Sequence, residues 1–194
     1  MLQYRIFRGK KIIPHIDEIA ALRIEVFREF PYLYEGNVVY EKEYLQPYVN
    51  SPNSGCILVF DQGKAIGAST CIPLSDEKEV FRKPFINEDP DAVFYFGESV
   101  LKKEYRGRGV GVEFFRIREG MASSLPQIRK TMFCAIERPL NHPLRPDDYK
   151  PLDSFWKKRG YWKRADLFIY LDWQDVDKSV SDEKKLVFWE KELL

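Results

Sequence analysis

The chain has little of the chemistry that metal sites and disulfide frameworks require. Only three of its 194 residues are cysteines, and Cys56, Cys71 and Cys134 each stand alone inside an apolar stretch. No Cys-x-x-Cys pair occurs, and an odd count of cysteines argues against a set of disulfides. We therefore expect no metal ion and three thiols that behave as small apolar side chains.

An excess of charge of one sign is also missing. The 31 lysines and arginines balance 30 aspartates and glutamates, which leaves a formal net charge of +1. Proteins that bind nucleic acids or membrane surfaces in general carry a basic excess. No apolar run approaches the roughly 18 residues of a membrane-spanning helix, and the N-terminus lacks the apolar core of a signal peptide. We expect a cytoplasmic protein that binds neither nucleic acid nor membrane.

Hydrophobic periodicity predicts a mixed succession of strands and helices. A chain of 194 residues suffices for one domain with its own core, which we expect to be a monomer or a homodimer. Residues 75–83 are expected to form a helical turn or flap, and residues 137–150 a long proline-bearing loop. The predicted strands are 2–7, 55–60, 64–72, 93–101, 130–136, 162–172 and 185–193. The predicted helices are 16–30, 39–48, 112–125 and 151–159.

The most informative segment runs from Arg106 to Gly111 and reads Arg-Gly-Arg-Gly-Val-Gly. It lies where the predicted strand 93–101 gives way to a helix. The first N–H groups of a helix have no partner within it, and with the helix dipole they attract anions. Glycines let the backbone approach such an anion closely. The segment therefore predicts a phosphate-binding loop.

Two common nucleotide-binding loops do not match this segment. A dinucleotide-binding fingerprint needs a third glycine where this chain has Val112, and a P-loop needs Gly-Lys followed by Ser or Thr. The pattern Arg-x-x-Gly-x-Gly after a strand is instead typical of the GCN5-related N-acetyltransferases, the GNAT family. Residues 101–111 closely resemble that motif, and residues 155–161 resemble the Phe-Tyr-x-x-x-Gly-Phe helix end of the same family.

The resemblance extends to the order of elements and implies a fold. We expect an α/β (α+β) architecture, with residues 1–194 forming a single N-acetyltransferase-like domain. Its centre is a mixed, mostly antiparallel sheet of about seven strands with helices on both faces. The family's fourth and fifth strands splay apart, which here are residues 93–101 and 130–136.

The resemblance also implies acetyl-CoA, that is coenzyme A carrying an acetyl group, as the co-substrate. The loop amides hold its pyrophosphate, and the end of the fourth strand pairs with its pantetheine arm as an added strand. For Arg108 an alternative interpretation remains open, namely a solvated side chain that contacts no ligand. The residues implied in cofactor binding are Val100, Leu101, Arg106, Gly107, Arg108, Gly109, Val110, Gly111 and Asn141.

Acetylation of an amine needs a base, because a lysine-like amine is almost entirely protonated at neutral pH. Glu98, a carboxylate inside an apolar strand, is the foremost candidate, and a structural carboxylate paired with an Arg or Tyr is its alternative. Glu137, at the end of strand 130–136, is the second candidate. His142 in the long loop and deprotonation through water complete the set of alternatives.

The leaving thiolate lacks its usual proton donor. Trp156 occupies the position where the family commonly has a tyrosine, and an indole N–H is no useful general acid. Tyr149, just before the predicted helix 151–159, is the candidate substitute, with a plain turn residue as the alternative. No cysteine with a paired histidine is evident, which argues against a covalent acetyl-enzyme.

The sequence therefore predicts an acyltransferase that moves an acetyl group from acetyl-CoA to a primary amine by direct transfer in a ternary complex. The acceptor is expected to be a small molecule or a peptide, contacted by residues 31–48, 75–83 and 138–150. Tyrosines and glutamates in the first of these segments favour a cationic amine, and ordinary surface residues of a short helix are the alternative. The alternative is a noncatalytic acyl-CoA-binding or regulatory module with the same fold, for which Trp156 is the main argument.

Overall fold

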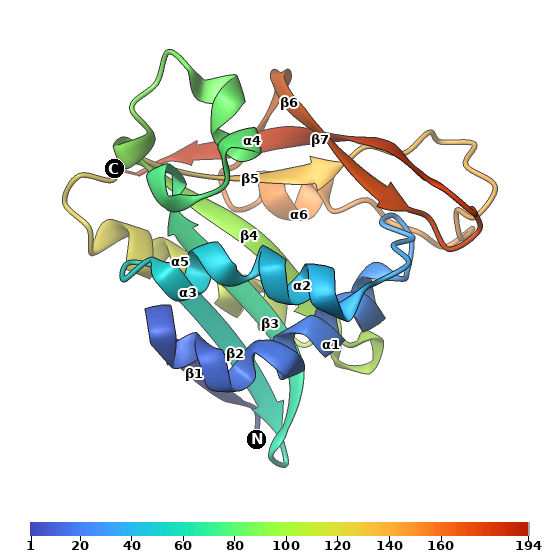
Figure 1. Ribbon diagram of the computed structural model, residues 1–194, viewed down its shortest axis with the longest axis horizontal. Coiled ribbons are helices and arrows are strands. Elements are labelled where there is room, and N and C mark those ends of the chain that lie inside the picture. The colour runs from blue at the N-terminus through green and yellow to red at the C-terminus, as the bar shows by residue number, and fades with distance from the viewer. Residues whose placement is uncertain (194) are drawn as a thin grey trace.

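The computed structural model describes residues 1–193, and seven strands form one sheet in the order β1-β2-β3-β4-β5-β7-β6 (Figure 1). The strands are β1 (Gln3–Phe7), β2 (Gly55–Asp61), β3 (Lys64–Pro73), β4 (Val93–Leu101), β5 (Lys130–Ile136), β6 (Trp162–Gln174) and β7 (Ser181–Glu192). The α-helices are α1 (Ile16–Phe27), α2 (Val38–Tyr44), α3 (Gln46–Asn50), α4 (Glu79–Arg82), α5 (Val110–Ser123) and α6 (Asp153–Lys157). Neighbouring strands are antiparallel except β4 and β5, which are parallel. This arrangement confirms the expected mixed, mostly antiparallel sheet.

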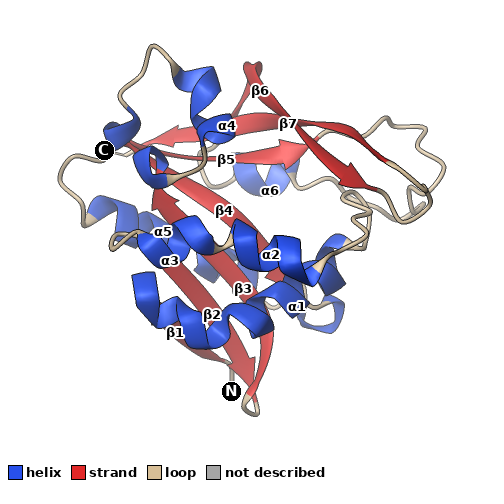
Figure 2. Cartoon of the chain, in the orientation of Figure 1, coloured by secondary structure: helices blue, strands red, loops and turns tan. Residues whose placement is uncertain are grey.

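Helices cover both faces of the sheet (Figure 2). One apolar cluster packs α1 to α4 against one face, with Tyr48, Tyr95 and Phe188 among its fully or almost fully buried members. The other packs α5 and α6 against the opposite face around Phe96 and Trp189. Aromatic side chains thus fill the core on both sides.

Several predicted elements have different bounds in the structure. The predicted helix 39–48 divides into α2 and α3, with Pro47 in the first turn of α3, where its missing N–H is tolerated. Asn37 caps α2, because its side chain accepts hydrogen bonds from the N–H groups of Val39 and Tyr40 at 2.9 and 3.1 Å. Residues 74–85 form two 3₁₀ turns around α4, of which the first is η2 (Leu74–Asp76).

The ladder between β4 and β5 ends early. It pairs residues 93–95 with residues 130–132, although β4 continues to Leu101 and β5 to Ile136. A β-bulge lies just beyond this point, because Gly97 and Glu98 of β4 stand opposite the single residue Thr70 of β3. The two strands diverge from there, as the fold expectation requires. The edge of β4 that faces β5 is left without sheet partners after Tyr95.

Three further findings concern expectations from composition. Within residues 1–193 no helix is both long and apolar enough to cross a membrane, and no group of His, Cys, Asp and Glu side chains is suited to a metal ion. All three cysteines are free and buried. The expectations about metals, cellular location, partners and domain organisation stay predictions.

Candidate active site

The glycine loop adopts the backbone that its composition predicts. Gly107 and Gly109 have φ angles of +77° and +83°, in the left-handed region that strains any other residue. Gly109 is the N-cap of α5, and the first bond of that helix runs from the N–H of Glu113 to the Gly109 carbonyl at 3.1 Å. The N–H groups of residues 110–112 therefore have no partner within the helix, which creates an anion site at its start.

The two arginines of the loop have different roles. Arg106 donates to the Leu101 carbonyl at 3.1 Å and holds both carboxylate oxygens of Glu29 at 2.7 and 3.2 Å. Arg108 is exposed, lies 5.2 Å from the centre of the Tyr105 ring and forms no ion pair within residues 1–193. Arg106 thus fixes the loop to the end of α1, while the charge of Arg108 is available to a ligand.

Helix α6 packs against the start of α5. A side chain at Gly111 would meet the ring of Phe155 at 3.2 Å, so the glycine permits this close approach. The Trp156 ring contacts Phe133 and Trp189 with centroid separations of 5.1 and 5.0 Å. Trp156 therefore serves to pack α6 onto the sheet, in agreement with the view that it supplies no acid.

The other residues expected near the cofactor lie in three different environments. Val100 is fully buried on the face covered by α1, and Leu101 is half-buried against the opposite cluster. Both belong to the part of β4 that lies beyond its ladder with β5. Asn141 is exposed in the loop after β5, and its side chain makes no hydrogen bond within the described chain.

Glu98 lies at the β4 bulge and is 5% exposed. Its Oε2 lies 2.6 Å from Nη1 of Arg23 in α1, and Arg23 also donates to Glu41 in α2. Burial opposes the charge of Arg23, but the carboxylates of Glu98 and Glu41 and the nearby Tyr44 raise its pKa well above the ordinary value. Glu98 is thus a buried carboxylate paired with an arginine, a contact that is compatible with a structural role and with a role as base.

The bulge and the start of the divergence gather further polar groups. The Glu98 N–H donates to the Thr70 hydroxyl at 3.3 Å, which fixes the bulge. The Tyr95 hydroxyl and the Cys134 thiol lie 3.3 Å apart and bridge β4 to β5 where their ladder ends. Burial raises the pKa of Cys134 to about 12, so this thiol is inert as a nucleophile. Burial also raises the pKa of Tyr32, and the guanidinium of Arg23 opposes this rise.

Glu137 lies apart from this cluster. It is exposed at the end of β5 and binds Lys163 of β6 and Lys185 of β7, the latter at 3.2 Å. The hydrogen bond from Lys163, with that from Lys185, lowers the pKa of Glu137 despite partial burial. A carboxylate held in its charged form by two lysines is a weaker base.

Tyr149 lies in the loop after β5 and packs on the connection between α1 and α2. Its ring meets the ring of Phe30 edge-on with a centroid separation of 4.6 Å. Burial raises the pKa of Tyr149, and the guanidinium of Arg145 opposes this rise. His142 lies 5.7 Å from the same Phe30 ring, and its Nδ1 accepts a hydrogen bond from the Leu144 N–H.

Sequence reasoning did not identify the partners of Glu98. Arg23 gave a signal, because it is a charged residue on the apolar face of the predicted helix 16–30. Glu41 and Glu77 gave none, since charged residues on short helices and turns are ordinarily exposed. In the structure both carboxylates are buried, with exposed fractions of 0% and 3%.

Comparison with solved structures identifies the fold. An acetyltransferase of the GNAT family from Streptococcus pneumoniae matches with a TM-score of 0.59 and 14% identity over 98% of this chain and 100% of that chain. The aminoglycoside acetyltransferase AAC(6')-Ib in complex with coenzyme A matches with a TM-score of 0.60 and 11% identity over 99% and 95%. Arabidopsis thaliana NAA60 in complex with a bisubstrate analogue matches with a TM-score of 0.61 and 11% identity over 100% of both chains.

Comparison by sequence gives no match. No protein-family profile matches the chain, and no curated protein matches it. Identities of 11–14% to the three structures establish a shared fold over the whole length.

Proposed function

We propose that this chain, whose fold is that of the GNAT acetyltransferases, moves an acetyl group from acetyl-CoA to a primary amine by direct transfer in a ternary complex. The observation that carries the proposal is the early divergence of β4 from β5. Beyond this divergence, β4 continues through a short connection to the glycine loop at the start of α5. An open strand edge and an anion site follow one another along a few residues. Acetyl-CoA has matching groups, amides in its pantetheine arm and a pyrophosphate beyond them.

The residues of this region fit the cofactor. The N–H groups of residues 110–112 and the charge of Arg108 suit the pyrophosphate, and the edge of β4 at Val100 and Leu101 suits the pantetheine amides. Acetyl-CoA supplies an acyl group on a thiol of good leaving ability. Arg106 is proposed to position the glycine loop and not to contact the cofactor, because its guanidinium is paired with the carboxylate of Glu29.

Glu98 is the proposed base, and Arg23 is the residue that positions it. Oε2 of Glu98 is in ion contact with Nη1 of Arg23 at 2.6 Å, whereas Oε1 has no partner within residues 1–193. Oε1 is thus the oxygen proposed to accept the proton of an amine, directly or through a water molecule. Glu137 does not act as the base, because its lysine partners hold it at the surface.

The acceptor is proposed to be an amine of a small molecule or a peptide. Among proteins with this fold, AAC(6')-Ib is an aminoglycoside acetyltransferase. Tyr149 is the proposed hydrogen-bond donor to the departing thiolate, and its ring packs edge-on against Phe30 in the connection between α1 and α2.

The test is release of free thiol from acetyl-CoA across a panel of amines, polyamines, amino acids and peptides. Glu98→Gln is expected to lower kcat by about a hundredfold or more, the usual share of a general base, while the affinity for CoA stays unchanged. Glu104→Gln, an exposed substitution of the same kind, is the matched control. Equal kcat values for wild type and Glu98→Gln would remove Glu98 from the mechanism.

The alternative is a noncatalytic acyl-CoA-binding or regulatory module. The packing of Trp156 between Phe133 and Trp189 supports it, because this side chain offers no acid to a leaving thiolate. Saturable CoA binding without thiol release for any amine in the panel would favour this alternative over transfer.

A further inference from the structure

The interior beside the β4 bulge holds more carboxylates than cations. Glu41, Glu77 and Glu98 are all at least 95% buried, and Arg23 is the buried cation that contacts two of them. Charged groups are rarely buried unless they are paired, because burial without a partner is strongly unfavourable. An additional positive charge would therefore be stabilised at this place.

The hydrogen bonds of this cluster are also incomplete. Among residues 1–193, seven buried side-chain oxygen and nitrogen atoms have no hydrogen-bond partner, and five of them belong to this cluster. The five are Glu41 Oε1, Tyr48 Oη, Glu77 Oε2, Glu98 Oε1 and Glu98 Oε2. The Tyr48 hydroxyl is close enough to lower the pKa of Glu77, but it is among the atoms without a hydrogen-bond partner. Four of the five are carboxylate oxygens, of which Glu98 Oε2 faces Arg23, so the cluster has more acceptors than donors and would be stabilised by an additional donor.

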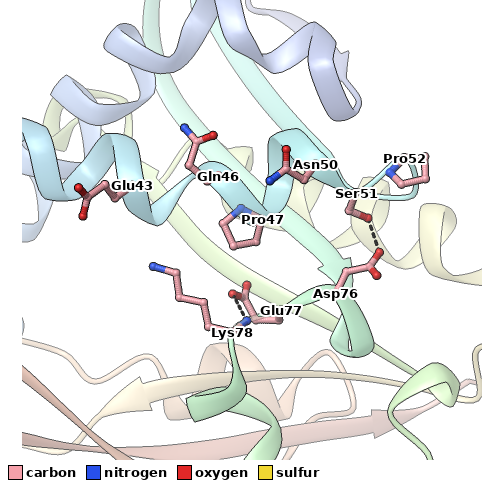
Figure 3. A pocket seen from close by; sticks show the side chains of 9 residues that line it. All are labelled: Glu43, Gln46, Pro47, Asn50, Ser51, Pro52, Asp76, Glu77 and Lys78. Carbon is pink, nitrogen blue, oxygen red and sulfur yellow. Dashed lines mark hydrogen bonds between the residues drawn. The ribbon is translucent and has the colours of Figure 1, made fainter.

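A surface pocket reaches one member of this cluster, Glu77. It has a volume of about 450 Å³, lies between α3 and η2, and includes Glu77 in its lining. Figure 3 shows the Glu77 carboxylate below Pro47 and next to Lys78, with its bond to the Lys78 N–H. That bond engages Oε1 at 2.8 Å, and Oε2 is the unpartnered oxygen. Glu43 and Asp76 add two further carboxylates to the lining.

Lys78 lines the pocket, and its ammonium group lies over two tyrosine rings next to the pocket. Its Nζ lies 5.4 Å from the centre of the Tyr44 ring and 6.0 Å from that of Tyr40. It forms no ion pair with any carboxylate in the described part of the chain, so the tyrosine faces provide its contacts. Aromatic faces attract cations, and an ammonium group from a ligand would find the same faces beside a free carboxylate oxygen.

We propose that this pocket binds an ammonium group of the acceptor at Glu77, so that the acceptor is a molecule with a second amine besides the one acetylated. The inference rests on the proposed function. An ammonium group paired with a buried carboxylate stays charged and cannot attack a thioester. The reacting nitrogen must therefore be a different one, and Glu98, whose charge acts on Glu77, lies nearby at the strand divergence.

The first experiment is calorimetric titration of the full chain with 1,4-diaminobutane, in the absence of acetyl-CoA. Saturable binding is expected, with an affinity about tenfold or more above that of n-butylamine. Glu77→Gln is expected to weaken diamine binding about tenfold to a hundredfold, in line with the loss of a charge-assisted hydrogen bond. Glu79→Gln, an exposed neighbour outside the pocket, is the matched control and should leave the affinity unchanged.

A second variant is expected to act in the opposite direction. Lys78→Met removes the internal cation that competes for the tyrosine faces, and it should strengthen diamine binding roughly twofold to fivefold. A misfolded variant would not bind more tightly. Absence of saturable diamine binding, or equal affinities for wild type and Glu77→Gln, would overturn the proposal.

Two outcomes distinguish failure of the amine subsite from failure of the proposed acetyl transfer. Acetyl transfer that proceeds with the same KM for 1,4-diaminobutane in wild type and Glu77→Gln would preserve the transferase and refute the subsite. Glu77-dependent diamine binding in a chain that does not bind CoA would preserve the subsite and refute the transferase.

Discussion

Glu77 is a carboxyl group that the fold buries without a dedicated cation. Burial raises its pKa, against the opposing effects of the Lys78 N–H and the Tyr48 hydroxyl. The folded chain therefore binds a proton at Glu77 more tightly than the unfolded chain does. The stability that this proton contributes is fully present below the ordinary pKa of a glutamate and is lost as the pH rises through the raised pKa.

Glu77→Gln should remove this loss of stability. Relative to wild type, the variant is expected to gain free energy of unfolding as the pH rises from about 4 to about 8, because the amide has no proton to lose. Urea unfolding of both proteins at several pH values measures the difference. A difference that stays constant over this range would contradict the account of Glu77.

The environment of single residues was only partly predictable from the sequence. The buried place of Glu98 could be predicted from its apolar strand, and its pairing with an arginine was one of two interpretations. Which arginine it is depends on how α1 packs over the bulge, and that is a property of tertiary structure. Glu77 follows η2 in a segment with no periodicity, so its burial could not be predicted.

A substitution at the start of α5 tests the claim that this segment binds the pyrophosphate of CoA. Gly109→Glu places a carboxylate at the anion site and strains a residue with φ of +83°. Affinity for CoA is expected to fall by about tenfold or more, since the new charge repels the pyrophosphate.

Gly63→Glu is the matched control for this substitution. Gly63 has φ of +81°, no atoms near the position of a side chain, and a place in the turn between β2 and β3. The backbone strain and the charge change are the same, so CoA affinity should stay at the wild-type value. Equal losses in the two variants would show that strain, and not the anion site, controls binding.

The body of the same helix offers a stabilising change. Gly120 is exposed, and a side chain there would meet no atom within 4 Å. Gly120→Ala is expected to raise the free energy of unfolding by roughly 0.5–1 kcal/mol, because alanine loses less backbone entropy in a helix. Thermal unfolding measures this change, and a lowered melting temperature would contradict it.

Helices and strands with a clear hydrophobic periodicity could be predicted from the sequence, whereas breaks and bulges within them could not. The strand 93–101 and the strand 130–136 were predicted with the bounds of β4 and β5. The break between α2 and α3 was missed, because the tyrosines at 40, 44 and 48 keep a helical spacing through it. The β4 bulge was missed as well, since it depends on the register with β3.

The two halves of the molecule on either side of the divergence are joined by hydrogen bonds of Arg138, which a buried ion pair with Asp175 holds in place. Arg138, after β5, holds both oxygens of Asp175 at 2.7 and 2.8 Å and donates to the carbonyls of Pro31 and Tyr32. Asp175 follows β6 and is fully buried, and Lys184 lies 3.6 Å away. This network fixes the connection between α1 and α2 to the β6–β7 hairpin.

Asp175→Asn is expected to lower the free energy of unfolding by about 3–5 kcal/mol, because it leaves a buried guanidinium without its counter-charge. Chemical denaturation measures the loss. Asp166→Asn, which removes an exposed partner of Arg164, should leave stability nearly unchanged. A loss of the same size in both variants would contradict the assigned role of the buried network.

The measurement that tests the central claim most directly is titration of the full chain with CoA, followed by the backbone amide signals in NMR. The account predicts saturable shifts that are largest for residues 97–101 at the β4 edge and residues 107–112 at the start of α5. Saturation without changes at these two segments, or the absence of any binding, would contradict the claim that the cofactor binds where β4 and β5 diverge.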